Sequence, residues 1–287
     1  MAFFTNSASL TYGGRRIQSN TVTGEIRETV SLTKTAVTDE YTADDSVSFV
    51  ITLVNSGTEA VSGLTLTDDL GAYPMEAETL YPLAYTEGSL RSFLDGVPQS
   101  APTVSAGPPL VISDVAVPAG GSLVLAYETA VTAYAPLEAE SQITNTVTVT
   151  GEGIGTALKA SATVRTEDQP ELSVSKAVSP SVVAPGGVLS YSFEIFNSGN
   201  TAAEGGDEVI FSDSFEPVLT DVSVSMNGEA WTKDSNYTYD ELSGAFTTLP
   251  GQITVPAASF VQNPDGTRSV TPGVAKLVIK GKIKTGS

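Results

Sequence analysis

Three polar residue types recur at matched places in the two halves of this 287-residue chain, namely a Lys, an Asp and an Asn. In the first half, Lys34 stands in "SLTKTA", Asp68 in "LTLTDDL" and Asn145 in "ITNTVTV". Because residues two apart on a β-strand point to the same side, each of these groups shares a face with apolar neighbours. We therefore expect a Lys amine, an Asp carboxyl and an Asn amide to point into one apolar core.

These three groups could form a covalent bond between strands. A lone buried ammonium or carboxylate costs several kcal/mol, so the groups must contact one another. In apolar surroundings, desolvation favours a neutral Lys amine and a protonated Asp. The neutral amine can attack the Asn side-chain carbonyl, while the Asp carboxyl polarises that carbonyl and helps to transfer protons. Ammonia then leaves and an amide cross-link remains, in a single-turnover reaction that requires no cofactor and no metal.

A non-covalent alternative uses the same residues. The Lys and the Asp can form a buried ion pair and the Asn can supply hydrogen bonds, so that every group is satisfied without a new bond. A bulge in one strand would also turn a residue away from the inward face. The residue pattern by itself leaves both alternatives open.

The composition excludes most other catalytic chemistry. The chain has no His and no Cys, which excludes a Ser-His triad, a thiolate nucleophile, a disulfide and any metal site built from thiolates or imidazoles. The formal net charge is −19, and Arg91 is the only basic residue between Lys34 and Lys159, so nucleic acid is not an expected partner. No apolar run is long enough to span a membrane, and "MAFFTNSAS" does not have the pattern of a signal peptide.

Two repeats supply the strands that must position the three groups. The first begins "SLTKTAVTDEYTADDSVSFVITLVNSG" and the second "SVSKAVSPSVVAPGGVLSYSFEIFNSG". Lys34 and Asn55 are 21 residues apart, and so are Lys176 and Asn197. The second repeat also carries Asp213 in "VIFSDSF", at the place that matches the Asp of the first repeat.

Short alternating runs, broken at "NSG", "APGG" and "PAGG", predict an all-β chain with two tandem β-sandwich domains. We assign residues 1–28 to an N-terminal donor strand and linker hairpin, residues 29–166 to domain 1 and residues 167–287 to domain 2. Domain 1 closes with "ITNTVTVTG" at residues 143–151. Domain 2 reaches "TPGVAKLVIKGKI" without a comparable closing strand, so we expect it to be incomplete.

The strand that domain 2 needs has a match at the other end of the chain. The run "FTNSASLTY" at residues 4–12 aligns with the closing strand of domain 1 and places Asn6 where domain 1 has Asn145. An incomplete sandwich exposes unpaired backbone groups and an open core, which an added strand covers. The residues expected on the inward face of this donor strand are Phe4, Asn6, Ala8 and Leu10.

Donation of this strand to another subunit would build a polymer. Head-to-tail insertion is a heterologous contact, which propagates as a filament unless it closes into a ring. We expect Asn6 to meet Lys176 of the next subunit, with Asp213 as the helper. The alternative is that residues 4–12 only add an edge strand to domain 1. Edge lysines commonly discourage unwanted pairing, and we interpret three alternate lysines of the last strand in this way, which fits either alternative: Lys280, Lys282 and Lys284.

The repeat "SVSKAVSPSVVAPGGVLSYSFEIFNSGNTAAE", followed by a strand that ends in Asp and by "ITNTVTVTG" in the first copy, resembles the bacterial surface repeat called domain of unknown function 11. The resemblance covers nearly the whole chain. It implies immunoglobulin-like β-sandwiches of the kind found in stalks, adhesins and surface layers. The absent final strand of domain 2 departs from the family pattern.

The placement of Lys, Asp and Asn is also similar to that of Gram-positive pilins and collagen-adhesin domains, in which Lys-Asn isopeptide bonds form with an acidic helper. The similarity implies an internal bond in domain 1 that uses Lys34, Asp68 and Asn145. It also implies an intermolecular bond that uses Lys176, Asp213 and Asn6 of the next subunit. Two-repeat proteins of this size without a signal peptide further resemble components of clostridial spore appendages, which implies assembly inside the mother cell.

The sequence therefore favours a structural subunit of an extracellular or spore-surface filament, a homopolymer with no enzymatic turnover. A monomeric adhesin or ligand-binding module is the alternative, and it requires domain 2 to be stable without a partner. Deletion of residues 1–12 separates these two hypotheses.

Overall fold

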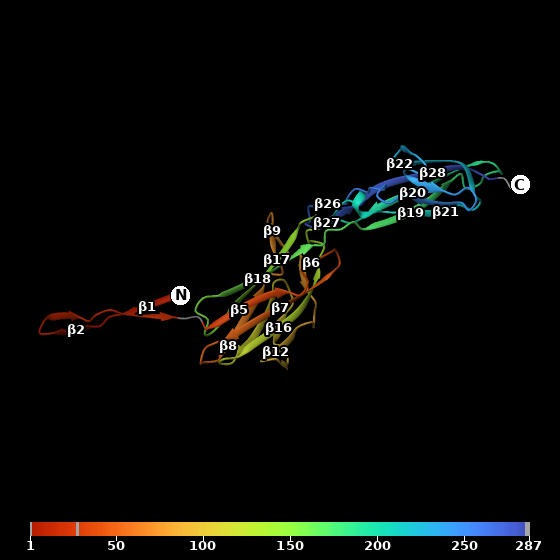
Figure 1. Cartoon of the computed structure of the whole chain (residues 1–287). Coiled ribbons are helices and arrows are strands. Elements are labelled where there is room, and N and C mark those ends of the chain that lie inside the picture. The colour runs from red at the N-terminus through yellow and green to blue at the C-terminus, as the bar shows by residue number, and fades with distance from the viewer. Residues whose placement is uncertain (1, 27–28, 285–287) are drawn as a thin grey trace. The chain divides into compact units, whose positions relative to one another are not determined.

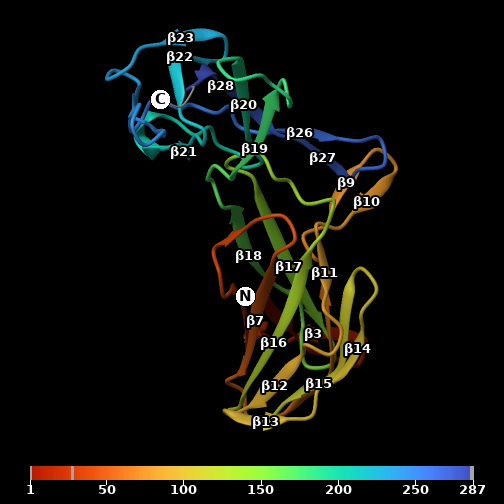
Figure 2. The ribbon, with the colours of Figure 1, turned by 90° about the vertical axis from the view of Figure 1, so that its right-hand side faces the viewer.

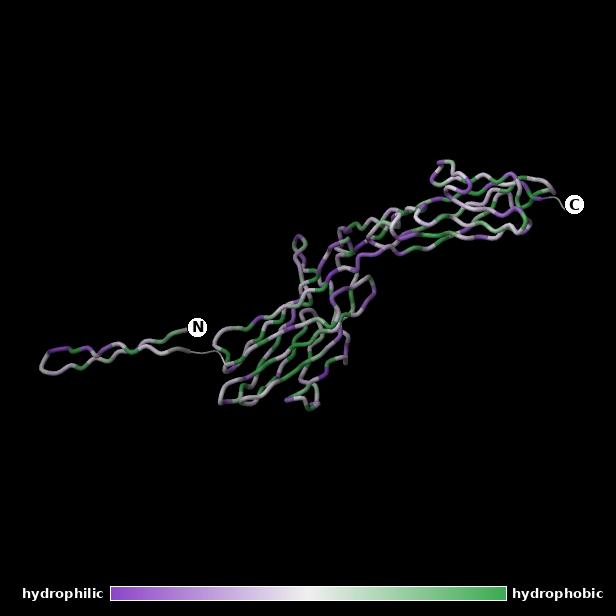
Figure 3. Tube along the Cα trace, in the orientation of Figure 1, coloured by the Kyte–Doolittle hydropathy of each residue, from purple (hydrophilic) through white to green (hydrophobic). Residues whose placement is uncertain are grey.

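The computed structural model describes residues 2–26 and 29–284. Its regular elements are β-strands and one short 3-10 helix, η1 (Gly205–Asp207). Hydrophobic and hydrophilic residues alternate along many strands (Figure 3), as expected for strands with one buried side. The all-β prediction is confirmed. In this part of the chain no helix has the length and apolarity to cross a membrane.

The chain divides into two compact units. Unit 1 comprises residues 1–135 and 142–165, and unit 2 comprises residues 136–141 and 166–287. Unit 1 holds the first repeat and unit 2 holds the second.

Residues 2–26 form a β-hairpin with its own pairing (Figure 1, red). Its strands are β1 (Ala2–Asn6), β2 (Ser9–Tyr12), β3 (Arg15–Gln18) and β4 (Val22–Ile26). Strand β1 pairs with β4 and β2 pairs with β3, around a turn in which Gly13 and Gly14 both have positive φ. The side chains of residues 3–23 are exposed. The alternative in which residues 4–12 extend a sheet of domain 1 is therefore wrong for the described chain.

Two sheets make up the body of unit 1 (Figure 2). The first sheet contains, in spatial order, β13 (Val97–Gln99), β12 (Arg91–Leu94), β16 (Ser122–Val131), β7 (Ser46–Asn55) and β5 (Val30–Ala36), and β11 (Leu83–Tyr85) also pairs with β16. Every second residue of β7 from Val47 to Asn55 is buried, because this central strand has one face on the core.

The second sheet of unit 1 contains, in spatial order, β14 (Thr103–Ser105), β15 (Leu110–Val117), β8 (Val61–Asp68), β17 (Gln142–Thr150), β18 (Leu158–Thr166) and β6 (Glu40–Tyr41). Strand β8 lies between β15 and β17, so that Asp68 is opposite Leu110 on one side and Val147 on the other. A small separate hairpin pairs β9 (Tyr73–Met75) with β10 (Glu78–Leu80).

Unit 2 repeats this plan with fewer strands. Its larger sheet contains, in spatial order, β19 (Leu172–Ser179), β20 (Val188–Asn197), β28 (Gly273–Ile283), β22 (Leu219–Met226) and β23 (Glu229–Trp231). Its smaller sheet contains β21 (Ser212–Ser214), β25 (Ala245–Thr248) and β24 (Tyr237–Tyr239), and β26 (Ser259–Gln262) pairs with β27 (Arg268–Thr271). Phe193, Phe215 and Phe246 are among the buried residues of one core cluster.

The strands of unit 2 correspond to strands of unit 1 that occur in the same order along the chain. Strands β5, β7 and β8 of unit 1 correspond to β19, β20 and β21 of unit 2, β12 to β15 correspond to β22 to β25, and β16 corresponds to β28. The described part of unit 2 has no strands that correspond to β17, β18 and β6.

The interpretation of the last lysines as edge residues is wrong. Strand β28 lies inside its sheet, between β20 and β22, and Lys280 is opposite Ser190 on one neighbour and Ser223 on the other. The sheet continues past β28 through β22, so alternate lysines of this strand lie on the exposed face of a central strand.

The "NSG" motif of each repeat has a structural role. The buried Asn55 amide donates to the carbonyl oxygens of Glu59 and Pro118, at 2.8 and 3.1 Å, and its own oxygen accepts from the N–H of Gly57. Asn197 makes the matching contacts in unit 2, where its amide donates to the carbonyl of Pro256 at 3.1 Å. Each Asn thus satisfies turn backbone groups that would otherwise be unpaired.

Candidate cross-linking sites

Four strands of unit 1 bring a polar cluster into the core. Lys34 lies on β5 and Tyr127 on β16, both in the first sheet, while Asp68 and Asn145 lie on the neighbouring strands β8 and β17 of the second sheet. All four side chains are buried. We call these four residues the unit 1 site.

The Lys and the Asp of the unit 1 site are in direct contact. Lys34 Nζ donates to Asp68 Oδ2 at 2.5 Å, and the exposed fractions of the two side chains are 0% and 1%. The Tyr127 hydroxyl donates to the same Oδ2 atom. The Lys34 ammonium also lies 4.8 Å from the ring centroid of Phe49. The cluster therefore links the two sheets through one carboxylate oxygen.

Burial changes the acid-base properties of this cluster. Desolvation lowers the pKa of Lys34 from its ordinary value to about 8, and the attraction of Asp68 only partly opposes this effect. Desolvation likewise raises the pKa of Tyr127 well above its ordinary value, and Asp68 adds to that shift. The neutral amine, which is the nucleophilic form, is thus much easier to reach for Lys34 than for a solvated lysine.

Asn145 is the unsatisfied member of the site. Its side chain is fully buried, and neither Oδ1 nor Nδ2 has a hydrogen-bond partner among the described residues. The amide lies close enough to the Tyr127 hydroxyl to oppose part of that residue's pKa shift, but no hydrogen bond of acceptable geometry joins them. A buried polar atom without a partner costs roughly 1–3 kcal/mol, so two such atoms in one side chain require an explanation.

Condensation with Lys34 would explain the Asn145 amide. In such a reaction the Lys34 Nζ lone pair would attack Asn145 Cγ, the Cγ–Nδ2 bond would break, and Nδ2 would leave as ammonia with the proton released by the amine. The unsatisfied Nδ2 would then be gone, and Oδ1 would become the carbonyl of a secondary amide. Asp68 is placed to accept and return the proton, since its Oδ2 already contacts Nζ. The non-covalent alternative assigned hydrogen bonds to Asn145, and it makes none among the described residues.

Unit 2 contains the same pair without the Asn. Lys176 Nζ on β19 donates to Asp213 Oδ2 on β21 at 2.6 Å. The lysine also lies close to three aromatic rings, with 5.1 Å to the centroid of Tyr191, 5.4 Å to that of Phe193 and 5.7 Å to that of Phe215. We call Lys176, Asp213 and these three rings the unit 2 half-site.

The unit 2 half-site is open to solvent. The exposed fractions of the Lys176 and Asp213 side chains are 47% and 17%, and every residue of β19 is exposed. Apolar residues on the same face of β19 are also uncovered, with exposed fractions of 39% for Leu172, 58% for Val174 and 42% for Val178. Strand β21 pairs with β25 along one edge, and no described strand pairs with its other edge, where β17 pairs with β8 in unit 1.

The structure places Asn6 on β1, in the exposed hairpin, where it is opposite Val22 of β4. Phe4 lies on the same strand, and its ring lies against Gly24, at a place that a β-carbon would fill. Ala8 follows β1, and Leu10 lies on β2 with 64% of its side chain exposed. The expected donor residues are thus solvent-exposed in the single chain.

Sequence reasoning missed the aromatic residues of both sites. Phe49 and Tyr191 occupy matching positions of the repeats, 15 residues after Lys34 and Lys176. That spacing could have suggested an aromatic wall next to each lysine. Comparison of the repeats could not have suggested Tyr127. In unit 1 Tyr127 of β16 pairs with Phe49, but in unit 2 the residue of β28 that pairs with Tyr191 is Ile279.

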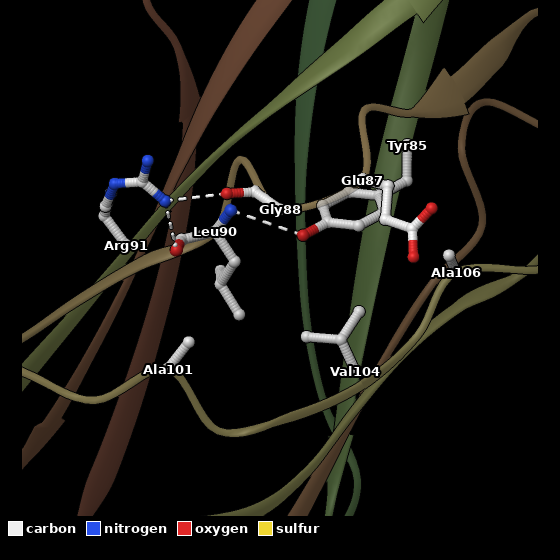
Figure 4. A pocket seen from close by; sticks show the side chains of 8 residues that line it. All are labelled: Tyr85, Glu87, Gly88, Leu90, Arg91, Ala101, Val104 and Ala106. Carbon is white, nitrogen blue, oxygen red and sulfur yellow. Dashed lines mark hydrogen bonds between the residues drawn. The ribbon is translucent and has the colours of Figure 1, made fainter.

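A separate open cavity of about 360 Å³ lies elsewhere in unit 1 (Figure 4). Its lining includes Tyr85, Glu87, Arg91 and Val104. The Arg91 guanidinium donates to the carbonyl oxygens of Gly88 and Leu90, and the Tyr85 hydroxyl accepts from the N–H of Leu90. The polar groups on this side of the cavity thus have partners in the protein, and we assign it no role.

No protein-family model matches the sequence, and no curated protein matches it. Among solved structures, BcpA, the major pilin subunit of Bacillus cereus, is 12% identical with a TM-score of 0.37, over 94% of this chain and 73% of that chain. The pilus backbone RrgB of Streptococcus pneumoniae is 10% identical with a TM-score of 0.34, over 85% of this chain and 55% of that chain. The collagen adhesin CNA of S. aureus is 15% identical with a TM-score of 0.31, over 55% of this chain and 56% of that chain. The chain therefore spans little more than half the length of RrgB and CNA. TM-scores at this level carry no functional argument, which rests instead on the residues of the two sites.

Proposed function

We propose that the chain is a structural subunit of an extracellular filament. Subunits join head to tail when the N-terminal strand of one, residues 4–12, enters unit 2 of the next. An isopeptide bond between Asn6 and Lys176 then locks each joint, and a bond between Lys34 and Asn145 locks unit 1 internally.

One observation carries this proposal. Lys176 and Asp213 are held at 2.6 Å beside three aromatic rings, and the face that Asn145 and β17 cover in unit 1 is uncovered in unit 2. Asn6 lies in residues 4–12, whose sequence matches β17, and it is exposed. A filled site and an open site of the same design, together with a spare matching strand, support exchange of that strand between chains.

Each residue has a defined role in the joint. The Lys176 amine attacks Cγ of Asn6, Asp213 holds the amine and transfers its proton, and ammonia leaves. Covering of the half-site by the donor strand removes water from the amine, which favours its neutral form. The donor strand thus brings the electrophile and activates the nucleophile in the same event.

Because the donating and accepting surfaces differ, an open filament of any length has a free donor strand at one end and a free acceptor unit at the other. A chain that lacks residues 1–12 retains the acceptor and loses the donor. We expect this truncated chain to stay soluble and monomeric, and to shorten wild-type filaments when mixed with them, because it terminates one end. Filament length by electron microscopy measures both effects.

Denaturing gel electrophoresis of boiled protein, followed by mass spectrometry of its peptides, tests the covalent joint. We expect a ladder of bands and a branched peptide that joins Asn6 to Lys176 and is lighter by one ammonia than its two parts. A single band at the monomer mass, with both residues unmodified, would contradict the covalent joint. Full-length filaments from the truncated chain would contradict strand donation itself.

A further inference from the structure

In unit 1, the strand that carries Asn145 does not enter its sheet alone. Strand β17 pairs with β18 from the contact of Gln142 with Arg165 to that of Val149 with Leu158. Strand β18 also pairs with β6 on its other side, and the N–H of Arg165 donates to the carbonyl of Asp39 at 2.8 Å. Val164, on the inward face of β18, is fully buried. The site of unit 1 is thus completed by a two-stranded hairpin.

Among the residues that the structure describes, unit 2 also has a segment without a pairing strand at the place where β18 would pair. Strand β6 begins six residues after Lys34, and the matching residues after Lys176 are Val182 and Val183. Tyr41 of β6 is 1% exposed, whereas Val182 is 87% exposed and neither valine lies in a strand. A two-residue strand needs a neighbour to form, so its absence in unit 2 indicates that a β18 counterpart is missing as well.

The second half of the N-terminal hairpin matches β18. Val22 precedes Lys34 by twelve residues, and Val164 precedes Lys176 by the same number, in the similar runs "TVTGEI" and "TVRTED". Val22 is 53% exposed in the single chain. Val22 pairs with Asn6 in the hairpin. In unit 1 Asn145 pairs with Ala162, which precedes Val164 by two residues, so the two hairpins differ in register by two residues. A shift of two residues keeps the same side chains on the same face, so Asn6 and Val22 can both point into an acceptor core.

We propose that the whole N-terminal hairpin, with β4 as well as the donor strand, docks onto unit 2 of a second copy of this chain. In this arrangement Asn6 covers Lys176 and Asp213, and β4 pairs with residues 181–183 as β18 pairs with β6. This inference rests on the proposed strand donation and adds the second strand, its register and its docking surface.

Hairpin docking also makes the join between two subunits similar to the join between the two units of one chain. Val22 of the hairpin and Val164 of β18 each stand twelve residues before the lysine that follows, Lys34 and Lys176. A filament built in this way is a continuous series of complete sandwich domains, each completed by a docked hairpin.

A matched pair of full-length variants tests the second strand. Val22→Asp puts a carboxylate at the position of the fully buried Val164, whereas Thr21→Asp puts the same charge at the position of the exposed Thr163. Both residues are exposed in the single chain, so neither change should alter folding of the units. We expect filament growth of Val22→Asp to be at least about tenfold slower than that of Thr21→Asp, because docking would bury an unpaired charge.

Equal growth of the two variants, with wild-type filaments present, would overturn hairpin docking and leave donation by residues 4–12 intact. If the wild-type chain does not polymerise, the proposed function itself is contradicted. Hydrogen exchange of wild-type filaments gives a second measure, which does not depend on a variant. We expect amides of β4 and of residues 181–183 to become protected on assembly, and fast exchange of both segments in filaments whose residues 4–12 are protected would contradict the docking.

Discussion

Lys34 and Asp68 lie in contact across the two sheets of unit 1, with 2.5 Å between Nζ and Oδ2 and at most 1% of either side chain exposed. Lys176 and Asp213 keep nearly the same distance, 2.6 Å, but are 47% and 17% exposed. The contact itself therefore does not require the strand that carries the Asn, whereas burial of the contact does. Since burial favours the neutral, nucleophilic form of an amine, we expect the lysine to become reactive only when that strand arrives.

Replacement of Asn145 by Ala tests the internal bond. If the bond forms, the wild-type chain is lighter by one ammonia and the variant is not. The closed loop from Lys34 to Asn145 is about a hundred residues long, and a cross-link of that span contributes about 5 kcal/mol to the free energy of unfolding in the chain-entropy description. We expect a loss of that order for unit 1, measured by chemical denaturation.

Asn145→Ala gives a different result if the internal bond does not form. Without a bond, the variant only removes two unsatisfied buried atoms, so unit 1 would keep or gain stability. Gln142→Ala, at an exposed position of the same strand, is the matched control and should change neither the mass defect nor the stability.

The rate of internal bond formation should depend on pH through the Lys34 amine. Its pKa is lowered to about 8 by burial, and the neutral amine is the attacking form. Below pH 8 the rate should rise about tenfold per pH unit, and above it the rate should level off. Loss of ammonia after refolding, followed by intact mass at a series of pH values, measures this profile. A rate that falls between neutral and mildly alkaline pH would contradict attack by the neutral amine.

The same pKa shift predicts the stability of the unbonded protein. In Asn145→Ala, the unfolded chain binds more protons at Lys34 than the folded chain does between pH 8 and the ordinary lysine pKa of 10.5. The free energy of unfolding should therefore rise with pH across this window, as far as Lys34 contributes. Adding Lys34→Met to Asn145→Ala should remove that contribution, and an unchanged slope would assign it to other groups.

The Tyr127 hydroxyl gives a test that separates the two sites. It donates to Asp68 in unit 1, whereas Ile279 occupies the matching position in unit 2. Tyr127→Phe removes the hydrogen bond that holds the Asp68 carboxyl in place beside Lys34. We expect slower formation of the internal bond and an unchanged rate for the joint between subunits, both measured by peptide mass spectrometry. Equal slowing of both would indicate a general loss of fold instead.

Strand alternation was enough to place the polar groups of unit 1. Lys34, Asp68 and Asn145 each share a face with apolar residues in the sequence, and all three are buried in the structure. The sequence could not predict that Asn145 lacks a partner, because that depends on the distances of all neighbours from its amide. It could not predict Tyr127 either, since the pairing of β16 with β7 sets which residue faces Phe49.

The second unit shows where alternation fails as a guide. Leu172, Val174 and Val178 have the pattern of an inward face, yet they are exposed, because burial also requires a strand on the far side of the core. The lysines of β28 do not lie at a sheet edge for a related reason. A sheet edge is defined by spatial neighbours, and β22 returns beside β28 from an earlier part of the chain.

Asn6→Ala is the sharpest test of the joint between subunits, because the hairpin offers its own control. Asn20 is a second exposed asparagine of the same hairpin, and it aligns with Ala162, which carries no amide. We expect Asn6→Ala to form filaments that dissociate completely in hot detergent, since strand donation survives and the cross-link does not. Asn20→Ala should keep the detergent-resistant ladder of the wild type. Resistance that persists in Asn6→Ala would exclude Asn6 as the bonding partner, and loss of resistance in Asn20→Ala would move that role to Asn20.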